Sequence, residues 1–492
     1  MDKSLKNEDI ITRKKIAMCF FSPIGTDYVP TDIGYLIAIL QAAGMAEKYD
    51  FEIIQFSYDP GQNNRKIQAN GEMVRQSVVR DVDLLEYHQP DVTFIFLDNV
   101  LWSKILAFGR AVAVAEEIKR RQPQMFIGFQ SYKLQKEQSW RTLEEKKADC
   151  VINGNPEISF LQLEHILKKE YVEGVQYLKE AISQKKDKSI KNLCGMSDNS
   201  LDYLPSPYLN HIFDNYLQAR QREKGDNFRT FVVSSRGCSF GCYYCFRSVK
   251  FDRVRYFSAK RFYEEIEYLF NSFKIWRFFV LDDAFLYSKE RIKEFVVEFQ
   301  VRLEKNPGLK KIEFFIMARP ETIDEEMIDY LAALQVKYIQ IGLQTINPAL
   351  QHYMKRGIDV SYFKKIREWM RKYNIGLHLD IVIGLPGDSA EWFKATLRYA
   401  LSLDPFSLQL KQFYLNPNTL FQVKKERYGI KIEECERYFD VPYVVKTMNM
   451  EPGYFEKVDD FVVKKSNEYP HIRWKYLTEK NSFLHHAQKK DV

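Results

Sequence analysis

Short apolar runs alternate with helix-length segments in two successive stretches of this 492-residue chain. In the first stretch the apolar runs have the length of buried strands, and the segments between them carry apolar residues near helical spacing. Strands that alternate with helices are joined by right-handed crossovers and build a parallel sheet. The first stretch therefore predicts an α/β fold with a Rossmann-like, doubly wound parallel sheet. Its expected strands are residues 14–21, 51–58, 91–97, 124–128 and 149–152.

A second alternation begins at Phe228. Six strands and five amphipathic helices make up most of a (β/α) barrel, in which catalytic groups lie where the strands end at their carboxyl side. This stretch predicts a partial (β/α)6, TIM-like barrel. The expected strands are residues 228–235, 276–282, 311–317, 337–342, 376–383 and 407–413. The expected helices are residues 260–273, 289–304, 324–334, 361–373 and 389–401.

These patterns predict four parts of the chain. Residues 13–200 form the Rossmann-like domain, residues 201–227 a linker, residues 228–425 the partial barrel, and residues 426–492 a small C-terminal region. The C-terminal region mixes aromatic and charged residues, and we expect it to cap the barrel or to contact the substrate.

Composition excludes several classes of protein. Hydrophobic residues make up 45% of the chain and charged residues 28%, which is ordinary for a globular protein. The net charge of +7 is small and scattered, so it does not indicate nucleic acid. No apolar run reaches the ~18 residues of a membrane span. An odd count of seven cysteines and a polar start favour a cytoplasmic protein with reduced thiols over a secreted disulfide framework.

Three of these cysteines stand close together, as Cys238, Cys242 and Cys245. Three thiolates at this spacing can surround one corner of an iron–sulfur cube and leave one iron open, whereas a closed cluster normally takes four cysteines. A structural zinc site needs a fourth Cys or His nearby. No histidine lies between His211 and His352, so local zinc fits poorly, and chance is the other alternative.

The sequence SSRGCSFGCYYC at residues 234–245 resembles the signature loop of the radical S-adenosylmethionine (SAM) superfamily. The resemblance implies that the three cysteines hold a [4Fe–4S] cluster and that SAM occupies the fourth iron. One electron, from a donor such as flavodoxin or ferredoxin, would cleave SAM to methionine and a 5′-deoxyadenosyl radical. The cofactor supplies the difficult chemistry, and the protein positions it and excludes water.

Four further motifs fall where this family places its SAM contacts, each at the end of an expected strand. The family's usual diglycine is missing from the first motif, where only the acidic pair stands. Taken singly, these motifs also suit a solvated strand end or an ordinary turn. The resemblance implies SAM contacts from Asp282 and Asp283, Arg319, Gln344, and Gly384 with Pro386.

The first stretch resembles the cobalamin-binding subfamily of radical SAM proteins through VPTDIGYL at residues 29–36 and SPYL at residues 206–209. The resemblance implies cobalamin held over the barrel mouth. The motif Asp-x-His-x-x-Gly is absent and His88 lies in a polar segment, so we expect no histidine ligand to cobalt. The implied cobalamin contacts are Tyr28, Pro30, Gly128, Gly154 and Asn155.

The leading hypothesis is therefore a cobalamin-dependent radical SAM enzyme that methylates a carbon centre of a natural product or peptide precursor. A second hypothesis dispenses with cobalamin: a peptide epimerase or cyclase in which Cys435 donates a hydrogen atom. A small buried apolar residue is the other interpretation of Cys435. The third hypothesis is a non-catalytic iron–sulfur protein.

Overall fold

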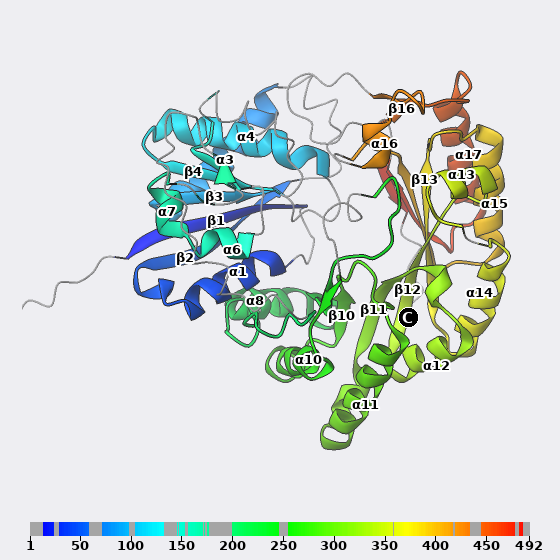
Figure 1. Ribbon diagram of the computed structural model, residues 1–492, viewed down its shortest axis with the longest axis horizontal. Helices are drawn as coiled ribbons and strands as arrows, with labels where there is room; N and C mark the ends of the chain where they lie inside the picture. The colour runs from blue at the N-terminus through cyan, green and yellow to red at the C-terminus, as the bar shows by residue number, and fades with distance from the viewer. Residues whose placement is uncertain are drawn as a thin grey trace, which may run out of the picture.

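The computed structural model shows two α/β regions side by side, the N-terminal one in blue and cyan and the other in green to red (Figure 1). The structure describes residues 13–23, 29–58, 71–97, 104–131, 145, 147–152, 156–170, 172, 175–176, 199–245, 254–357, 359–416, 419–432, 444–477 and 482–485. Each region is built on its own sheet, as the two alternations in the sequence predict.

The first sheet has strand order β2-β1-β3-β4-β5-β6, in which the first five strands are parallel. Its strands are β1 (Lys14–Pro23), β2 (Tyr49–Tyr58), β3 (Val92–Phe96), β4 (Phe126–Gln130), β5 (Cys150–Ile152) and β6 (Val175–Gln176). The order 2-1-3-4-5 belongs to doubly wound sheets, which bind ligands beyond the carboxyl ends of the strands. The predicted Rossmann-like sheet is confirmed.

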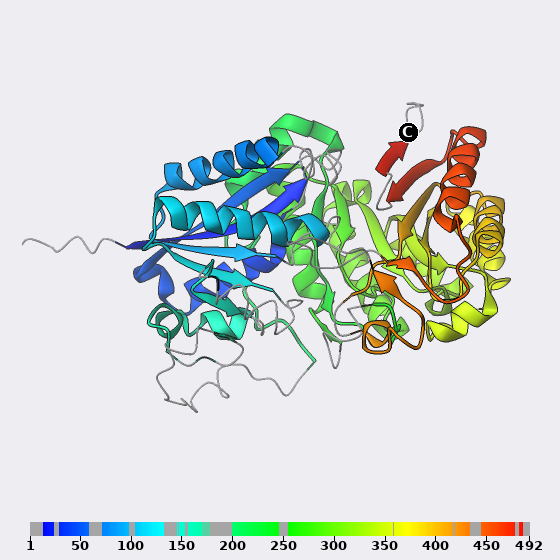
Figure 2. The same cartoon turned by 90° about the horizontal axis from the view of Figure 1, so that it is seen from above.

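Helices cover both faces of the first sheet (Figure 2). Two long helices, α3 (Gly71–His88) and α4 (Lys104–Arg121), pack on one face. The other face carries α1 (Thr31–Ala42), the short helix η1 (Met45–Glu47), α6 (Pro156–Phe160) and α7 (Leu163–Leu167). Because both faces are covered, β3 is buried along its whole length, which explains its unbroken apolar sequence.

The second sheet has the order β18-β17-β14-β13-β12-β11-β10-β7 and is parallel except at β18. Its strands are β7 (Thr230–Val232), β10 (Arg277–Val280), β11 (Glu313–Ala318), β12 (Val336–Gln344), β13 (Gly376–Ile383), β14 (Ser407–Gln412), β17 (Arg473–Leu477) and β18 (Ser482–His485). The six predicted strands are confirmed. The C-terminal region, expected only as a cap or a substrate contact, also lengthens this sheet by two strands.

The helices of the second region begin at residues that cap them. Ser258, Ser288, Asp324 and Ser389 each accept a hydrogen bond from a backbone amide of the helix that follows. The helices are α8 (Asp214–Lys224), η4 (Gly225–Asn227), α10 (Ala259–Phe273), α11 (Lys289–Lys305), η5 (Pro307–Lys311), η6 (Pro320–Thr322), α12 (Glu325–Ala333), α13 (Pro348–Tyr353), α14 (Tyr362–Lys372), α15 (Ala390–Ser402), α16 (Leu420–Val423) and α17 (Tyr454–Glu468).

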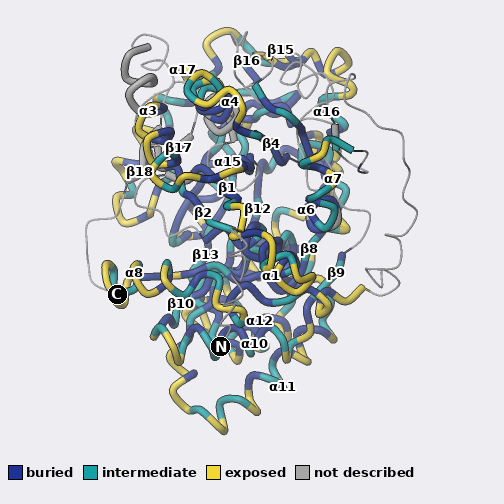
Figure 3. Tube along the Cα trace, turned by 90° about the vertical axis from the view of Figure 1, so that its left-hand side faces the viewer, coloured by how far each residue is buried: buried dark blue, intermediate teal, exposed yellow. Residues whose placement is uncertain are grey.

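The largest core lies between the second sheet and its outer helices, and the buried segments in Figure 3 run along the strands of both sheets. Two short pairings lie outside the large sheets: β8 (Ser235–Arg236) with β9 (Arg255–Tyr256), and β15 (Lys431–Ile432) with β16 (Val444–Lys446). None of the helices that the structure describes is long and apolar enough to cross a membrane.

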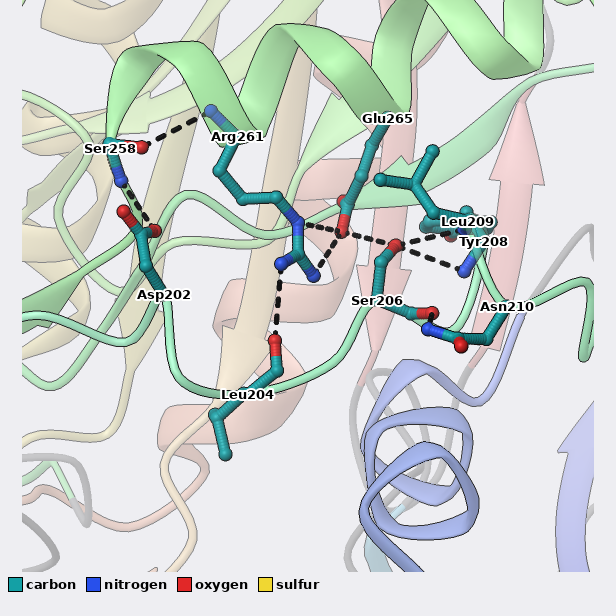
Figure 4. Close-up of polar contacts among 9 residues, drawn as sticks. All are labelled: Asp202, Leu204, Ser206, Tyr208, Leu209, Asn210, Ser258, Arg261 and Glu265. Atoms are coloured by element: carbon teal, nitrogen blue, oxygen red, sulfur yellow. Dashed lines mark hydrogen bonds and ion pairs between the residues drawn. The ribbon is translucent and has the colours of Figure 1, made fainter. Parts of the chain in front are cut away.

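The segment between the two regions is fixed by a buried carboxylate (Figure 4). Glu265 of α10 accepts a hydrogen bond of 2.7 Å from the Ser206 hydroxyl and one of 3.1 Å from Arg261. The same hydroxyl accepts hydrogen bonds from the backbone amides of Tyr208 and Leu209, and Arg261 also donates to the carbonyl of Leu204. The connection that carries the SPYL motif is therefore held on α10.

Candidate functional site

The three clustered cysteines lie on the loop that follows β8, at the carboxyl end of the second sheet's first strand. The loop turns back on itself where the Cys245 amide donates to the Cys242 carbonyl over 3.1 Å. Burial first, and then the charges of Asp283, Cys245 and Cys242, raise the pKa of Cys238 to about 11. The charges of the other two cysteines and of Asp283 therefore act on the Cys238 thiol.

Arg319, at the end of β11, reaches into this loop. Its guanidinium donates to the Cys242 sulfur over 2.9 Å and to the Glu321 carboxylate, and it lies 4.2 Å from the centre of the Phe240 ring. A cation so placed stabilises thiolate charge, which iron ligands carry. Arg319 was predicted to contact SAM; the structure places it beside a cysteine sulfur.

Gln344, at the end of β12, lies on the same side of the sheet in a left-handed backbone conformation, with φ of +62°. It is 7% exposed, and within the described part of the chain its Oε1 is buried without a hydrogen-bond partner. Its amide folds over Gly342, where a β-carbon would lie 2.3 Å from Nε2. A strained backbone and an unused buried acceptor are typical of a ligand contact.

A buried arginine that the sequence analysis did not select connects Gln344 to the cysteine loop. Arg356 donates to the Tyr244 hydroxyl over 3.0 Å and to the Gly342 carbonyl over 2.7 Å. Tyr244 stands inside the cysteine motif, between two of the cysteines. Nothing in the sequence marks Arg356, because it lies in a short segment after α13 without a recognisable motif.

The two aspartates at the end of β10, Asp282 and Asp283, have different roles. Asp282 is completely buried and accepts hydrogen bonds from the amides of Ser234 and Ser235, over 2.7 and 2.9 Å, and from both of their hydroxyls. Asp282 therefore shapes the chain just before Cys238 and acts as a positioning residue. Of the two carboxylates, Asp283 is the one whose charge acts on Cys238.

The loop is also attached to the first region through Arg236, two residues before Cys238. Its guanidinium forms an ion pair with Glu157 of α6 and lies 4.9 Å from the centre of the Tyr35 ring on α1. Asp32 of α1 approaches the same guanidinium at 4.0 Å. The cysteine loop therefore takes its position from both sheets.

The GLPG turn at the end of β13 is held from outside by the C-terminal helix α17. Gly384 has φ of +80°, and its amide donates to the Tyr454 hydroxyl over 3.0 Å. That hydroxyl donates to Asp388 over 2.6 Å, and burial raises the pKa of Asp388 to about 7 despite this bond. Pro386 is buried within the turn. Figure 1 shows α17 beside α15, on the outer side of the sheet.

The structure places two of the implied cobalamin contacts. Pro30 is buried and precedes the first residue of α1. Gly128 lies inside β4, where a β-carbon would stand 2.4 Å from the Phe94 ring, so the packing of this ring explains the glycine. Tyr28, Gly154 and Asn155 lie outside the described residues, as does Cys435.

A polar cluster that the sequence analysis missed lies on the concave side of the second sheet. Asp380 accepts hydrogen bonds from Gln340 over 2.6 Å and from Gln409 over 2.7 Å. Burial opposes ionisation of Asp380, but His378 and then the charge of Lys411 lower its pKa to about 2. Neighbours of these residues along β13 and β14, such as Leu379 and Leu408, pack in the core under the helices. The polar side chains therefore point the opposite way, into the barrel.

Burial lowers the pKa of both lysines of this cluster. Lys475, directly opposite Gln409 on β17, has a pKa well below its usual range because burial and the charge of Lys411 both disfavour its ammonium form. Burial also lowers the pKa of Lys411, while Asp380 opposes that shift. Two amines and one carboxylate give the floor of the barrel a set of buried hydrogen-bonding groups.

The chemistry of the donor set, three cysteine sulfurs, fits an iron–sulfur cluster. Among the described residues, no group of three or more His, Cys, Asp or Glu side chains is arranged to hold one metal ion. In a cluster each cysteine binds a different iron, so the sulfurs stand farther apart than the ligands of one ion. Arg319 on Cys242 and the unused Oε1 of Gln344 fit a site that takes anionic sulfur and a polar cofactor.

Comparison with known proteins agrees with this geometry. Residues 232–400 match the radical SAM superfamily. An uncharacterised methyltransferase of Pyrococcus horikoshii is 25% identical over 259 residues, 52% of this chain and 53% of its own length. The cobalamin-dependent radical SAM methyltransferase TokK of Streptomyces tokunonensis is 22% identical over 81% of this chain and 56% of its own length. The chain thus spans about half the length of these curated relatives.

The fold has a solved counterpart. The radical SAM methyltransferase TsrM of Kitasatospora setae, whose structure contains cobalamin and a [4Fe–4S] cluster, superposes with a TM-score of 0.65 at 13% identity. The superposition covers 94% of this chain and 92% of TsrM. The arrangement of a doubly wound sheet beside a partial barrel is therefore shared along nearly the whole chain.

Proposed function

We propose that this chain, which carries a radical SAM domain at residues 232–400, is an enzyme that cleaves SAM reductively and modifies a carbon centre of its substrate. The observation that carries the proposal is the cysteine loop. Three cysteines stand on one loop at the carboxyl end of the sheet, and Arg319 donates to the sulfur of Cys242. When bound, a [4Fe–4S] cluster with SAM supplies a carbon-centred radical that removes hydrogen from carbon.

The chain's own residues would hold these groups in distinct ways. Cys238, Cys242 and Cys245 supply the iron ligands, and Arg319 offsets their negative charge. Gln344 offers a buried acceptor to a polar donor of SAM. Asp282 positions the loop. This division differs from the sequence prediction, in which Asp282, Arg319 and Gln344 all contact SAM.

The reaction that we propose is cobalamin-dependent C-methylation in the biosynthesis of a natural product or peptide. The likeness to TsrM over nearly the whole chain and the relation to TokK support it. The first sheet has the strand order of ligand-binding doubly wound sheets, and in Figure 1 the arrowheads of β1 and β3 point toward the second region. Cobalamin held at those strand ends would lie over the barrel.

The polar floor of the barrel supports a substrate that carries groups able to hydrogen-bond with it. Lys411 and Lys475 lie with Asp380 on the concave side of the sheet. The alternative is a cobalamin-independent peptide epimerase or cyclase in which Cys435, outside the described residues, is a candidate hydrogen donor.

Anaerobic reconstitution tests the proposal. The protein is loaded with iron and sulfide, reduced with dithionite and incubated with SAM, and 5′-deoxyadenosine is quantified. A separate sample is incubated with hydroxocobalamin and desalted, and its visible spectrum is recorded. We expect iron incorporation, SAM cleavage and retained corrin absorption. Iron incorporation without SAM cleavage would indicate a non-catalytic iron–sulfur protein. Cleavage without corrin retention would favour cobalamin-independent chemistry, and the mass of the product would then separate epimerisation from cyclisation.

A further inference from the structure

A pocket of about 610 Å³ lies against the outer side of the cysteine loop. Its walls come from four segments: the loop itself at Tyr243, the end of α13 with the residues that follow it, the segment at and after α16, and Met448 after β16. The cationic and imidazole side chains that line it are His352, Lys355, Arg356, Lys424 and Arg427, and none of its lining residues is an aspartate or glutamate. The pocket is therefore strongly cationic.

The walls are bonded directly to the cysteine loop. The Tyr243 amide donates to the Met354 carbonyl over 3.2 Å, and the Phe421 amide donates to the Tyr243 carbonyl over 3.4 Å. On the loop, a β-carbon at Gly241 would lie 3.1 Å from the Lys355 ammonium nitrogen. The pocket therefore borders the cysteine loop at Tyr243, the neighbour of Cys242.

The charges of the pocket are available to a partner. Lys355, Lys424 and Arg427 are exposed, and they form no ion pair within the described part of the chain. By contrast, Lys425 in the same segment lies 3.9 Å from Glu426 and does not line the pocket. Unpaired surface cations that converge on one opening attract and orient acidic proteins.

We propose that this pocket is the docking site for an acidic one-electron donor protein of the flavodoxin or ferredoxin class. The inference rests on the proposed function, because radical chemistry at the cysteine loop needs one electron for each SAM cleaved. The donor loses one electron and the iron–sulfur group gains it, so no other co-reactant is required. Tyr243, with its backbone bonded to both walls, separates the docked donor from Cys242.

The test compares a double charge reversal in the pocket with a matched reversal beside it. Lys424→Glu with Arg427→Glu changes the pocket, and Lys425→Glu changes an exposed lysine of the same segment. The probe is a recombinant flavodoxin with an acidic surface. Its Kd for the reconstituted protein is measured at low and high salt, and 5′-deoxyadenosine formation is driven either by reduced flavodoxin or by dithionite.

We expect the double variant to weaken flavodoxin binding and flavodoxin-driven SAM cleavage by roughly tenfold or more at low salt. Dithionite-driven cleavage should stay unchanged, because a small reductant needs no docking surface. Lys425→Glu should change either quantity by no more than about threefold.

The proposal is overturned if the double variant binds flavodoxin as tightly as the wild type, or if Lys425→Glu has the same effect. It is also overturned if dithionite-driven cleavage falls equally, because the pocket would then belong to the active site. If the wild type cleaves no SAM with dithionite, the proposed function fails instead, and the binding measurement still decides whether the pocket docks the donor.

Discussion

Two glycines of the first region and three of the second are required for different reasons. In the first region, a β-carbon at Gly34 would lie 2.3 Å from the Phe213 ring, and one at Gly128 would lie 2.4 Å from Phe94. In the second region, Gly237, Gly384 and Gly387 have φ values of +104°, +80° and +96°, which side chains rarely tolerate. Neighbouring rings dictate the first set, and the backbone turns of the site dictate the second.

This difference shows how far each motif supports a function. Around the second sheet, the strand-end motifs meet at the cysteine loop, where Arg319 touches a cysteine sulfur and Asp282 orders the chain before it. In the first sheet, Gly128 is explained by packing alone. The relation of the first region to cobalamin proteins therefore depends on its fold, whereas that of the second region depends on its chemistry.

The largest expected effect is the loss of iron incorporation and SAM cleavage, and it should occur for a cysteine of the second region but not for one of the first. Cys242→Ala should abolish iron incorporation and SAM cleavage, because the loop would lose one of its three iron ligands. Cys19→Ala is the matched control, since Cys19 is completely buried in β1. We expect it to keep full iron content at a stability cost of about 1 kcal/mol. Assays of bound iron and of 5′-deoxyadenosine measure both effects. Retention of SAM cleavage in Cys242→Ala would refute the assignment of Cys242 as an iron ligand.

A smaller loss is expected at Asp282, which orders the chain just before the cysteine loop. Asp282→Ala leaves the buried amides of Ser234 and Ser235 without their acceptor, which should lower the free energy of unfolding by roughly 2–4 kcal/mol. Asp282→Asn should cost less because one oxygen remains. Urea denaturation measures the loss, and iron analysis shows whether the loop still forms. A wild-type denaturation midpoint in Asp282→Ala would contradict this role.

The packing explanation of Gly128 predicts a more moderate effect. Gly128→Ala should lower the free energy of unfolding by about 1–3 kcal/mol because the new methyl group overlaps the Phe94 ring. Iron content should be unchanged. Adding Phe94→Leu should recover part of the loss, and a double-mutant cycle with urea denaturation measures this coupling. Additive losses would show that Phe94 is not the obstacle.

The smallest expected effect concerns pH. The pKa of Asp388 is raised to about 7 in the folded protein, above its value in the unfolded chain. The folded state therefore holds its proton to higher pH, and this contribution to stability, complete below about pH 4, is lost as pH rises through about 7. From about pH 5 to about pH 7 the loss should be about 2 kcal/mol. Asp388→Asn should remove it, as thermal denaturation at several pH values will show; an unchanged pH dependence would contradict the assignment.

The sequence predicts most of the fold, because the barrel strands and helices carry regular patterns and their helices begin at capping serines and aspartate. The two strands added by the C-terminal region were not predicted. In Arg473–Leu477 the lysine and arginine alternate with aromatic residues, and the structure shows why: Trp474 and Tyr476 pack in the core while Lys475 faces the barrel. Because cationic residues occupy alternate positions of this strand, a hydrophobicity pattern does not reveal it.

Site residues that are close together in the chain can be predicted from the sequence. Site residues that only the fold brings together cannot. The cysteine spacing is visible in a stretch of eight residues. The position of Arg356 beside Tyr244 and the cluster of Asp380 with Lys411 and Lys475 depend on the register of different strands and segments. Only the assembled sheet shows that such residues are neighbours.

Arg236 has a consequence for how the protein matures. Because its ion pair to Glu157 and its contact with Tyr35 lie two residues before Cys238, the first region anchors one end of the cysteine loop. Synthesis begins with the first region, so this anchor is made before the strands of the barrel that hold the rest of the loop. Expressed without the first region, the barrel would have to load iron on a loop that has lost this anchor.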